Sequence, residues 1–114
     1  MVGTLPNVSN LALQPTDTDQ YVVVFAALSE SLRLRMLQMM AHADTEIPCT
    51  ALDVELPIAK STISYHVQIL RRAGLIAVRK AGRNYFYRLR DDVLEAYVPG
   101  FLEHLKTTDD LILG

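Results

Sequence analysis

Apolar side chains recur at helical spacing in the first half of the chain. Residues 21–28 are apolar almost throughout, which predicts a helix that is buried on more than one side. Thr16 or Thr18 is expected to cap this helix, because a threonine oxygen can accept from the free backbone amides of the first turn. Residues 31–43 carry a wide, methionine-rich apolar stripe, which is typical of a helix that packs against a core.

The middle of the chain changes from helical to alternating periodicity. Residues 49–56 predict a short helix, and residues 59–73 predict a longer amphipathic helix that Gly74 terminates. Residues 75–79 and 84–89 then alternate polar and apolar side chains and are rich in Val, Tyr and Phe. The four residues between these segments include a glycine, so the pattern predicts a β-hairpin.

The order of these elements indicates the fold class. Residues 91–108 again show a helical stripe, in which Pro99 is expected to kink the helix or to start a second one. Helices followed by a polar-faced helix and a hairpin are typical of a winged helix-turn-helix, a mainly α fold with a small β-hairpin wing at residues 75–89. We therefore expect a loose arm over residues 1–15 and a single domain over residues 16–114.

The helix at residues 59–73 has two chemically different faces. Helical spacing places on the packing face Ile63, His66, Val67 and Leu70. The same spacing places on the outer face Ser61, Ser64, Tyr65, Gln68 and Arg72. The outer groups suit DNA, because hydroxyls bond phosphates and base edges and glutamine pairs with adenine. On the packing face, His66 is expected to be a core histidine whose hydrogen bonds are satisfied.

Charge is strongly segregated along the chain. Residues 59–90 hold eight basic and no acidic side chains, whereas the whole chain has a formal net charge of −2. Such a segment is typical of a protein that binds a polyanion, although a solvated basic face is the alternative. The candidate DNA contacts in the wing are Arg79, Lys80, Arg83 and Asn84.

Composition places the chain among ordinary globular proteins. Its 114 residues are half apolar, and the single cysteine, Cys49, excludes an internal disulfide. The first residues lack the features of a signal peptide, and no apolar run is long enough to span a bilayer. These observations predict a cytoplasmic protein without a membrane partner.

Two segments of the chain resemble the ArsR-type winged-helix repressors. They read LSESLRLRMLQMM and LPIAKSTISYHVQILRRAGLIAVRKAGRNYFYRL, and the resemblance covers roughly residues 21–106. The residues that carry it are Arg33-Leu34-Arg35 with Leu37, Ser61-Thr62, Ser64, His66, Leu70, Ala73-Gly74-Leu75, Gly82-Arg83 and Tyr87.

The resemblance implies a dimeric repressor that binds double-stranded DNA at an imperfect inverted repeat in a promoter. It places toward DNA the residues Lys60, Ser61, Thr62, Ser64 and Tyr65. It also implies a homodimer joined by the first and last helices. Candidate interface residues in those helices are Tyr21, Val24, Phe25, Leu28, Tyr97, Phe101 and Leu105.

The metal sites common in that family are not expected in this chain, and no cofactor is predicted. Cys49 is a lone thiol, and the C-terminal pattern around Asp92 and His104 lacks the spacing of the family's second site. Cys49 is expected to be a small packed residue, with redox sensing as the alternative. A small-molecule inducer bound between the terminal helices stays open.

Two other classes of function compete with a DNA-binding regulator. One is a winged-helix module that binds a protein partner and no DNA, which would not need the basic segment. The other is an enzyme that uses Ser64 and His66. These two side chains point about 200° apart on a helix and lack an orienting carboxylate, so no catalytic site is predicted.

Overall fold

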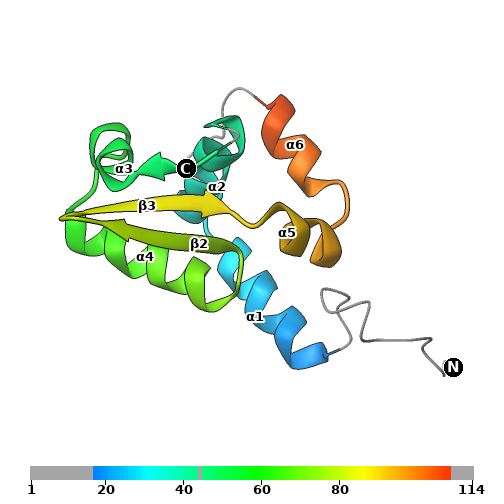
Figure 1. The fold of residues 1–114 in the computed structure, drawn as a ribbon. Coiled ribbons are helices and arrows are strands. Elements are labelled where there is room, and N and C mark those ends of the chain that lie inside the picture. Colours follow the sequence, from blue (N-terminus) through cyan, green and yellow to red (C-terminus); the bar gives the residue numbers. More distant parts are fainter. Residues whose placement is uncertain (1–16, 44, 109–114) are drawn as a thin grey trace, which may run out of the picture.

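Helices surround one small antiparallel sheet in the computed structural model, which describes residues 17–43 and 45–108 (Figure 1). In chain order the elements are α1 (Thr18–Leu28), α2 (Ser31–Ala43), β1 (Ile47–Pro48), α3 (Cys49–Glu55), α4 (Lys60–Arg72), β2 (Ile76–Ala81), β3 (Asn84–Leu89), α5 (Asp91–Tyr97) and α6 (Phe101–Thr107). This arrangement is the predicted winged helix-turn-helix. The expected arm at residues 1–15 lies outside the described residues.

The first helix is capped by an aspartate and not by a threonine. Asp17 adopts an extended backbone, and its Oδ1 accepts a hydrogen bond of 2.9 Å from the amide of Asp19. Thr18 lies inside α1, and Thr16 lies outside the described residues, so the expected threonine cap is corrected. A carboxylate both satisfies an unpaired amide and complements the positive end of the helix dipole.

The helix that carries the outer polar face ends as predicted at Gly74. The amide of Gly74 donates to the carbonyl of Arg71 at 2.9 Å, and the amide of Leu75 donates to that of Leu70 at 3.1 Å. These two bonds form a Schellman motif, which needs a left-handed residue after the helix. Gly74 supplies that conformation with φ of 82°.

The sheet contains three strands in the order β1-β3-β2, all antiparallel. The hairpin is tighter than expected, because β2 extends to Ala81, which pairs with Asn84. Only Gly82, with φ of 63°, and Arg83 remain in the turn. Sequence reasoning missed β1, since a two-residue strand is too short to show periodicity.

The core lies where α2, α4 and the sheet meet. The largest fully buried apolar side chains are Met36, Leu37, Met40, Leu52, Leu70, Leu75, Leu94, Leu105 and Val24. Met36 and Met40 of α2 are therefore in the core, and Met39 packs against it while partly buried. On α4, all four side chains of the predicted packing face are buried.

The C-terminal stripe forms two helices and not one. α5 ends at Tyr97, and α6 begins at Phe101 after Gly100, whose φ is 91°. Pro99 cannot donate a helical hydrogen bond, and Gly100 takes a left-handed conformation that ends the helical path. Of the two outcomes expected at Pro99, a kink or a second helix, the structure has the second helix, which begins two residues later at Phe101. α6 turns back to pack against α2 (Figure 1).

Arg33 of α2, a buried residue with 8% of its surface exposed, joins three helices through its guanidinium. Its Nε donates to the carbonyl of Ala27 at 2.7 Å, and its Nη2 donates to that of Ala26 at 3.3 Å, both near the end of α1. Its Nη1 lies 2.9 Å from Nδ1 of His66 on α4. Arginine can only donate, so Nδ1 accepts, and the predicted satisfied core histidine is confirmed.

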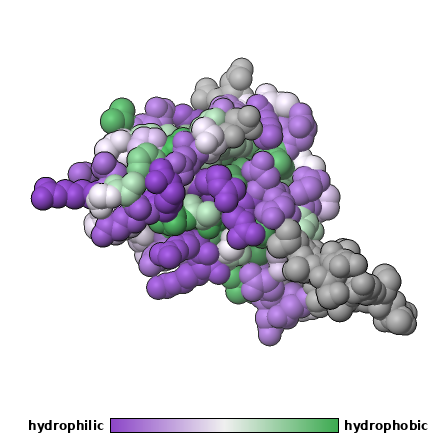
Figure 2. Space-filling model, in the orientation of Figure 1, coloured by the Kyte–Doolittle hydropathy of each residue, from purple (hydrophilic) through white to green (hydrophobic). Residues whose placement is uncertain are grey.

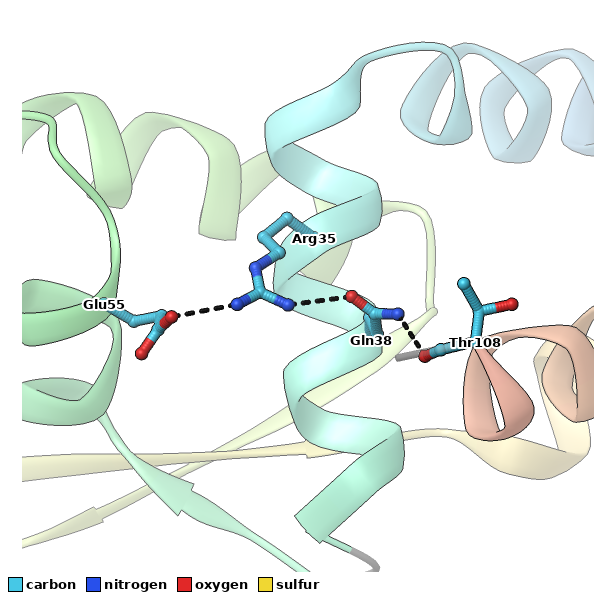
Figure 3. Close-up of polar contacts among 4 residues, drawn as sticks. All are labelled: Arg35, Gln38, Glu55 and Thr108. Carbon is cyan, nitrogen blue, oxygen red and sulfur yellow. Dashed lines mark hydrogen bonds and ion pairs between the residues drawn. The ribbon is translucent and has the colours of Figure 1, made fainter. Parts of the chain in front are cut away.

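A second series of polar contacts crosses α2 and links it to α3 on one side and to the end of α6 on the other (Figure 3). Arg35 forms an ion pair of 2.9 Å with Glu55 of α3 and donates to Oε1 of Gln38 at 2.8 Å. The amide of Gln38, a fully buried side chain, donates to the carbonyl of Thr108 at 2.6 Å. This series of contacts ties the end of α6 to the helix-turn-helix, because the carbonyls after a helix end need donors from elsewhere.

Replacing Arg33 by methionine tests the central junction. Met fills a similar volume but leaves His66 and the Ala27 carbonyl without their donor, so we expect a loss of about 2 kcal/mol or more in the free energy of unfolding. Urea denaturation measures the loss. The control Arg72→Met changes an exposed residue of α4 and should stay within about 0.5 kcal/mol of the parent. A stabilised Arg33→Met variant would show that desolvating the guanidinium costs more free energy than its hydrogen bonds contribute.

Candidate nucleic-acid interface

The outer face of α4 is open to solvent along its whole length. Its aromatic residue, Tyr65, is 62% exposed. The other exposed members are Lys60, Ser61, Ser64, Gln68 and Arg72, and Thr62 is half-buried. Lys60 at the helix start lies 3.8 Å from a carboxylate oxygen of Asp53, with its side chain 84% exposed. The sequence-predicted reading residues therefore share one accessible helical surface.

The strand register separates the basic side chains of the wing. Arg79 and Lys80 are neighbours in sequence, so they point to opposite faces of β2. The guanidinium of Arg79 lies over the Phe86 ring, 4.5 Å from its centroid, whereas the Lys80 ammonium lies 5.8 Å from the centroid of Tyr85. Tyr85 lies on the sheet face toward α4, because it lines a groove with α4 residues. Lys80 thus shares a face with α4, and Arg79 does not.

Arg79 is also held by a carboxylate. Its Nε donates to Oε2 of Glu46 at 3.2 Å, and its Nη2 donates to the other carboxylate oxygen. The hydrogen bonds from Arg79 lower the pKa of Glu46, and the charges of Arg79 and Arg88 add to the effect. Glu46 therefore stays ionised in moderately acidic solution, and its charge offsets that of Arg79. Sequence reasoning counted Arg79 as a free cation because Glu46 is distant in the chain.

The tip of the wing consists of polar and basic residues. Arg83 is exposed in the two-residue turn, and Asn84 is exposed at the start of β3. Figure 2 shows hydrophilic side chains projecting at the wing tip on the left and below the sheet, where α4 lies in Figure 1. The wing tip and the region of α4 are therefore both hydrophilic in this view.

A groove of about 280 Å³ separates α4 from the wing. Its helix side is formed by Ser64, Val67, Gln68 and Arg71. Its wing side is formed by Val78, Tyr85 and Tyr87. Sequence reasoning assigned Ser64 and Gln68 but missed Arg71 and Tyr85. The spacing contained a signal for Arg71, which follows Ser64 by seven residues on the same helical stripe.

The predicted dimer residues fall into two groups. Val24 and Leu105 are completely buried within the single chain, so they present no surface to a second one. Tyr21 and Tyr97 contact each other edge to face, with centroids 5.0 Å apart, and join α1 to α5. Leu28 and Phe101 are half-buried against the core, and Phe25 is 52% exposed.

The sulfur and imidazole groups are dispersed over the fold. Cys49 is half-buried at the start of α3. Nε2 of His42 lies 2.9 Å from the carbonyl of Leu105, and the His104 ring stacks on Phe101 with centroids 5.8 Å apart. In residues 17–43 and 45–108, no three His, Cys, Asp or Glu side chains group as ligands for a metal ion.

Ser64 and His66 do not form a reactive pair. Ser64 is exposed on the groove side of α4, whereas His66 is 7% exposed and its Nδ1 is engaged by Arg33.

A cavity of about 510 Å³ lies between the end of α2, the sheet and the start of α5, and its lining includes Met40, Arg88 and Asp91. This cavity is not between the terminal helices. Of the helices that the structure describes, none is long and apolar enough to cross a bilayer.

Comparison with known proteins places this chain in a family. The model of a helix-turn-helix domain matches residues 28–79. An uncharacterised HTH-type transcriptional regulator of Bacillus subtilis, YceK, is 36% identical over 97 residues, which cover 85% of this chain and 97% of that protein.

Solved structures agree with the sequence match. HlyU from Vibrio cholerae superimposes with a TM-score of 0.63 at 30% identity, over 77% of this chain and 89% of that one. An ArsR-like transcriptional regulator from Rhodococcus sp. RHA1 gives a TM-score of 0.60 at 25% identity, over 77% and 80%. The chain belongs to the ArsR-type family of winged helix-turn-helix transcriptional regulators, and it is a DNA-binding regulator.

Proposed function

We propose that the protein is a homodimeric repressor that reads an inverted-repeat operator with the outer face of α4 and holds the DNA backbone with its wing. The observation that carries the proposal is the exposed polar face of α4, which lies beside a wing whose segment of the chain contains no acidic residue. Such a face combines base-edge donors and acceptors with cations for phosphates.

The roles within this surface follow from position. Ser61, Ser64, Tyr65 and Gln68 are the base-reading candidates, because they are exposed along one side of the helix. The backbone candidates are Lys60, Thr62, Arg72, Lys80, Arg83 and Asn84. Arg79 is a weaker contact in this proposal, since its ion pair with Glu46 competes with a phosphate.

The second copy is proposed to pack against α1. Val22, Val23 and Phe25 are 60%, 43% and 52% exposed, although they are among the most apolar residues of that helix. Contiguous exposed apolar side chains on a small domain mark an interaction surface. A twofold pairing through α1 would present two α4 faces to the two halves of an inverted repeat.

Replacing single residues distinguishes base reading from backbone binding. We expect Tyr65→Ala to reduce the preference for a selected operator over a mixed-sequence duplex by about tenfold, with little effect on the mixed-sequence affinity. Arg83→Ala should weaken binding to both duplexes alike and lower the salt slope by about one. Fluorescence anisotropy over a salt series measures both, and Lys106→Ala on α6 controls for the loss of a cation. Equal losses on both duplexes for Tyr65→Ala would remove that residue from base reading.

A charge placed on α1 tests the dimer. Phe25→Glu puts a carboxylate within the exposed apolar patch, so we expect the dissociation constant of the dimer to rise by at least about tenfold. Sedimentation equilibrium measures the constant. Val54→Glu makes the same change at a position on α3 that is 86% exposed, and it should leave the constant unchanged. A monomeric parent protein, or equal constants for Phe25→Glu and the parent, would contradict pairing through α1.

A further inference from the structure

We infer that the groove between α4 and the wing binds one deoxyribose-phosphate unit of a DNA strand, with Arg71 and Tyr85 as its phosphate-binding side chains. This inference rests on the proposed DNA-binding surface. It adds a specific site between the base-reading face of α4 and the wing tip, and it names two residues that the proposed surface does not use.

The groove follows one stripe of side chains along α4. Ser64, Gln68 and Arg71 follow the three- and four-residue spacing of one helical stripe, which extends for about 10 Å along α4. Across from it, Tyr85 and Tyr87 alternate on one face of β3, and Tyr87 pairs with Val78 of β2. Regular elements thus form both walls, and their side chains are held in register by helix and sheet geometry.

The lining is apolar at depth and polar at the rim. Val67 and Tyr87 are 7% and 8% exposed, and Val78 is half-buried, so they form the floor. Ser64, Gln68, Arg71 and Tyr85 are exposed at the rim. A sugar-phosphate unit has the matching character, because its deoxyribose presents C–H groups and its phosphate accepts hydrogen bonds from arginine, serine, glutamine and tyrosine.

The electrostatics favour an anion at the rim. Arg71 is the charged residue of the lining, which contains no carboxylate. Lys60, Arg79 and Arg90 each lie within ion-pair distance of a carboxylate, and no such pair is formed by Arg71 within residues 17–43 and 45–108. The ammonium of Lys80 above the Tyr85 ring adds positive charge to the same rim. An ordered phosphate would therefore gain attraction without displacing an existing partner.

The site would fix the position of α4 in the major groove. A phosphate held between the helix and the wing ties one point of the DNA strand to both elements, and phosphate contacts set the register of a protein on the duplex. The reading residues on the outer face of α4 would then meet defined bases. Arg71 is in this sense a positioning residue and Tyr65 a reading residue.

The experiment compares Arg71→Gln, Tyr85→Phe and the control Arg90→Gln on a mixed-sequence duplex between about 50 and 200 mM salt. Arg90 belongs to the same basic segment, but its Nε lies 3.5 Å from Asp92 and it does not line the groove. We expect Arg71→Gln to lose about three- to tenfold in affinity and to lower the salt slope by about one. Tyr85→Phe should lose about two- to fourfold without changing the slope, because the lost hydroxyl is uncharged.

A second arm locates the contact on the DNA. Single phosphates of a selected operator are replaced by neutral methylphosphonates, and each duplex is titrated with the parent and with Arg71→Gln. One substitution per half-site should weaken the parent but cost Arg71→Gln nothing further, since both changes remove the same contact. Losses that add at every phosphate would overturn the inference.

The outcomes separate the site from the proposed function. Equal affinity and slope for Arg71→Gln and Arg90→Gln, with duplex binding intact in the parent, would reject the groove site and leave the DNA-binding surface standing. Absence of duplex binding by the parent would reject both. Binding of inorganic phosphate that Arg71→Gln abolishes, with unchanged duplex affinity, would assign the groove to a small anion and also overturn the inference. Equal urea midpoints for the variants would show that the fold is preserved.

Discussion

The buried guanidinium of Arg33 is the junction on which the arrangement of the helices depends. It donates to carbonyls at the end of α1 and to the imidazole of His66 on α4. A buried charge is costly unless it is hydrogen-bonded, so these partners fix where the two helices lie relative to α2. α1 carries the apolar patch proposed for a second chain, and α4 carries the proposed reading face. This side chain therefore helps to fix the position of one surface relative to the other.

In the wing, strand register determines which basic side chains face α4 and which pair with a carboxylate. The basic segment looks uniform in sequence, but alternation along β2 sends Arg79 to one face of the sheet and Lys80 to the other. Glu46 then pairs with Arg79, while Lys80 lies over Tyr85 beside the groove. The cations available to DNA are fewer than the formal charge suggests, and Lys80 lies beside the groove that contains Arg71. The path proposed for the DNA strand follows from this asymmetry.

Sequence reasoning predicted the elements whose signal is local. The packing and outer faces of α4, its end at Gly74 and the presence of the hairpin all follow from spacing over a few residues. The misses depend on contacts between distant segments. A strand of two residues has no periodicity, Glu46 meets Arg79 only through the sheet, and the buried state of Val24 and Leu105 depends on how α6 folds back on α2. Pro99 signalled a break in the last helix, but only the left-handed Gly100 shows where the chain turns.

The claim that a dimer reads DNA with paired α4 faces is tested most directly by selection of bound sequences. The protein is incubated with random-sequence duplexes at near-physiological salt, and the enriched pool is sequenced and mapped by hydroxyl-radical footprinting. The account predicts an inverted repeat whose half-sites are centred about 10 base pairs, or a whole multiple of that, apart. Enrichment of a single unpaired half-site would contradict the dimer, and a pool without enriched sequences would contradict base reading by α4.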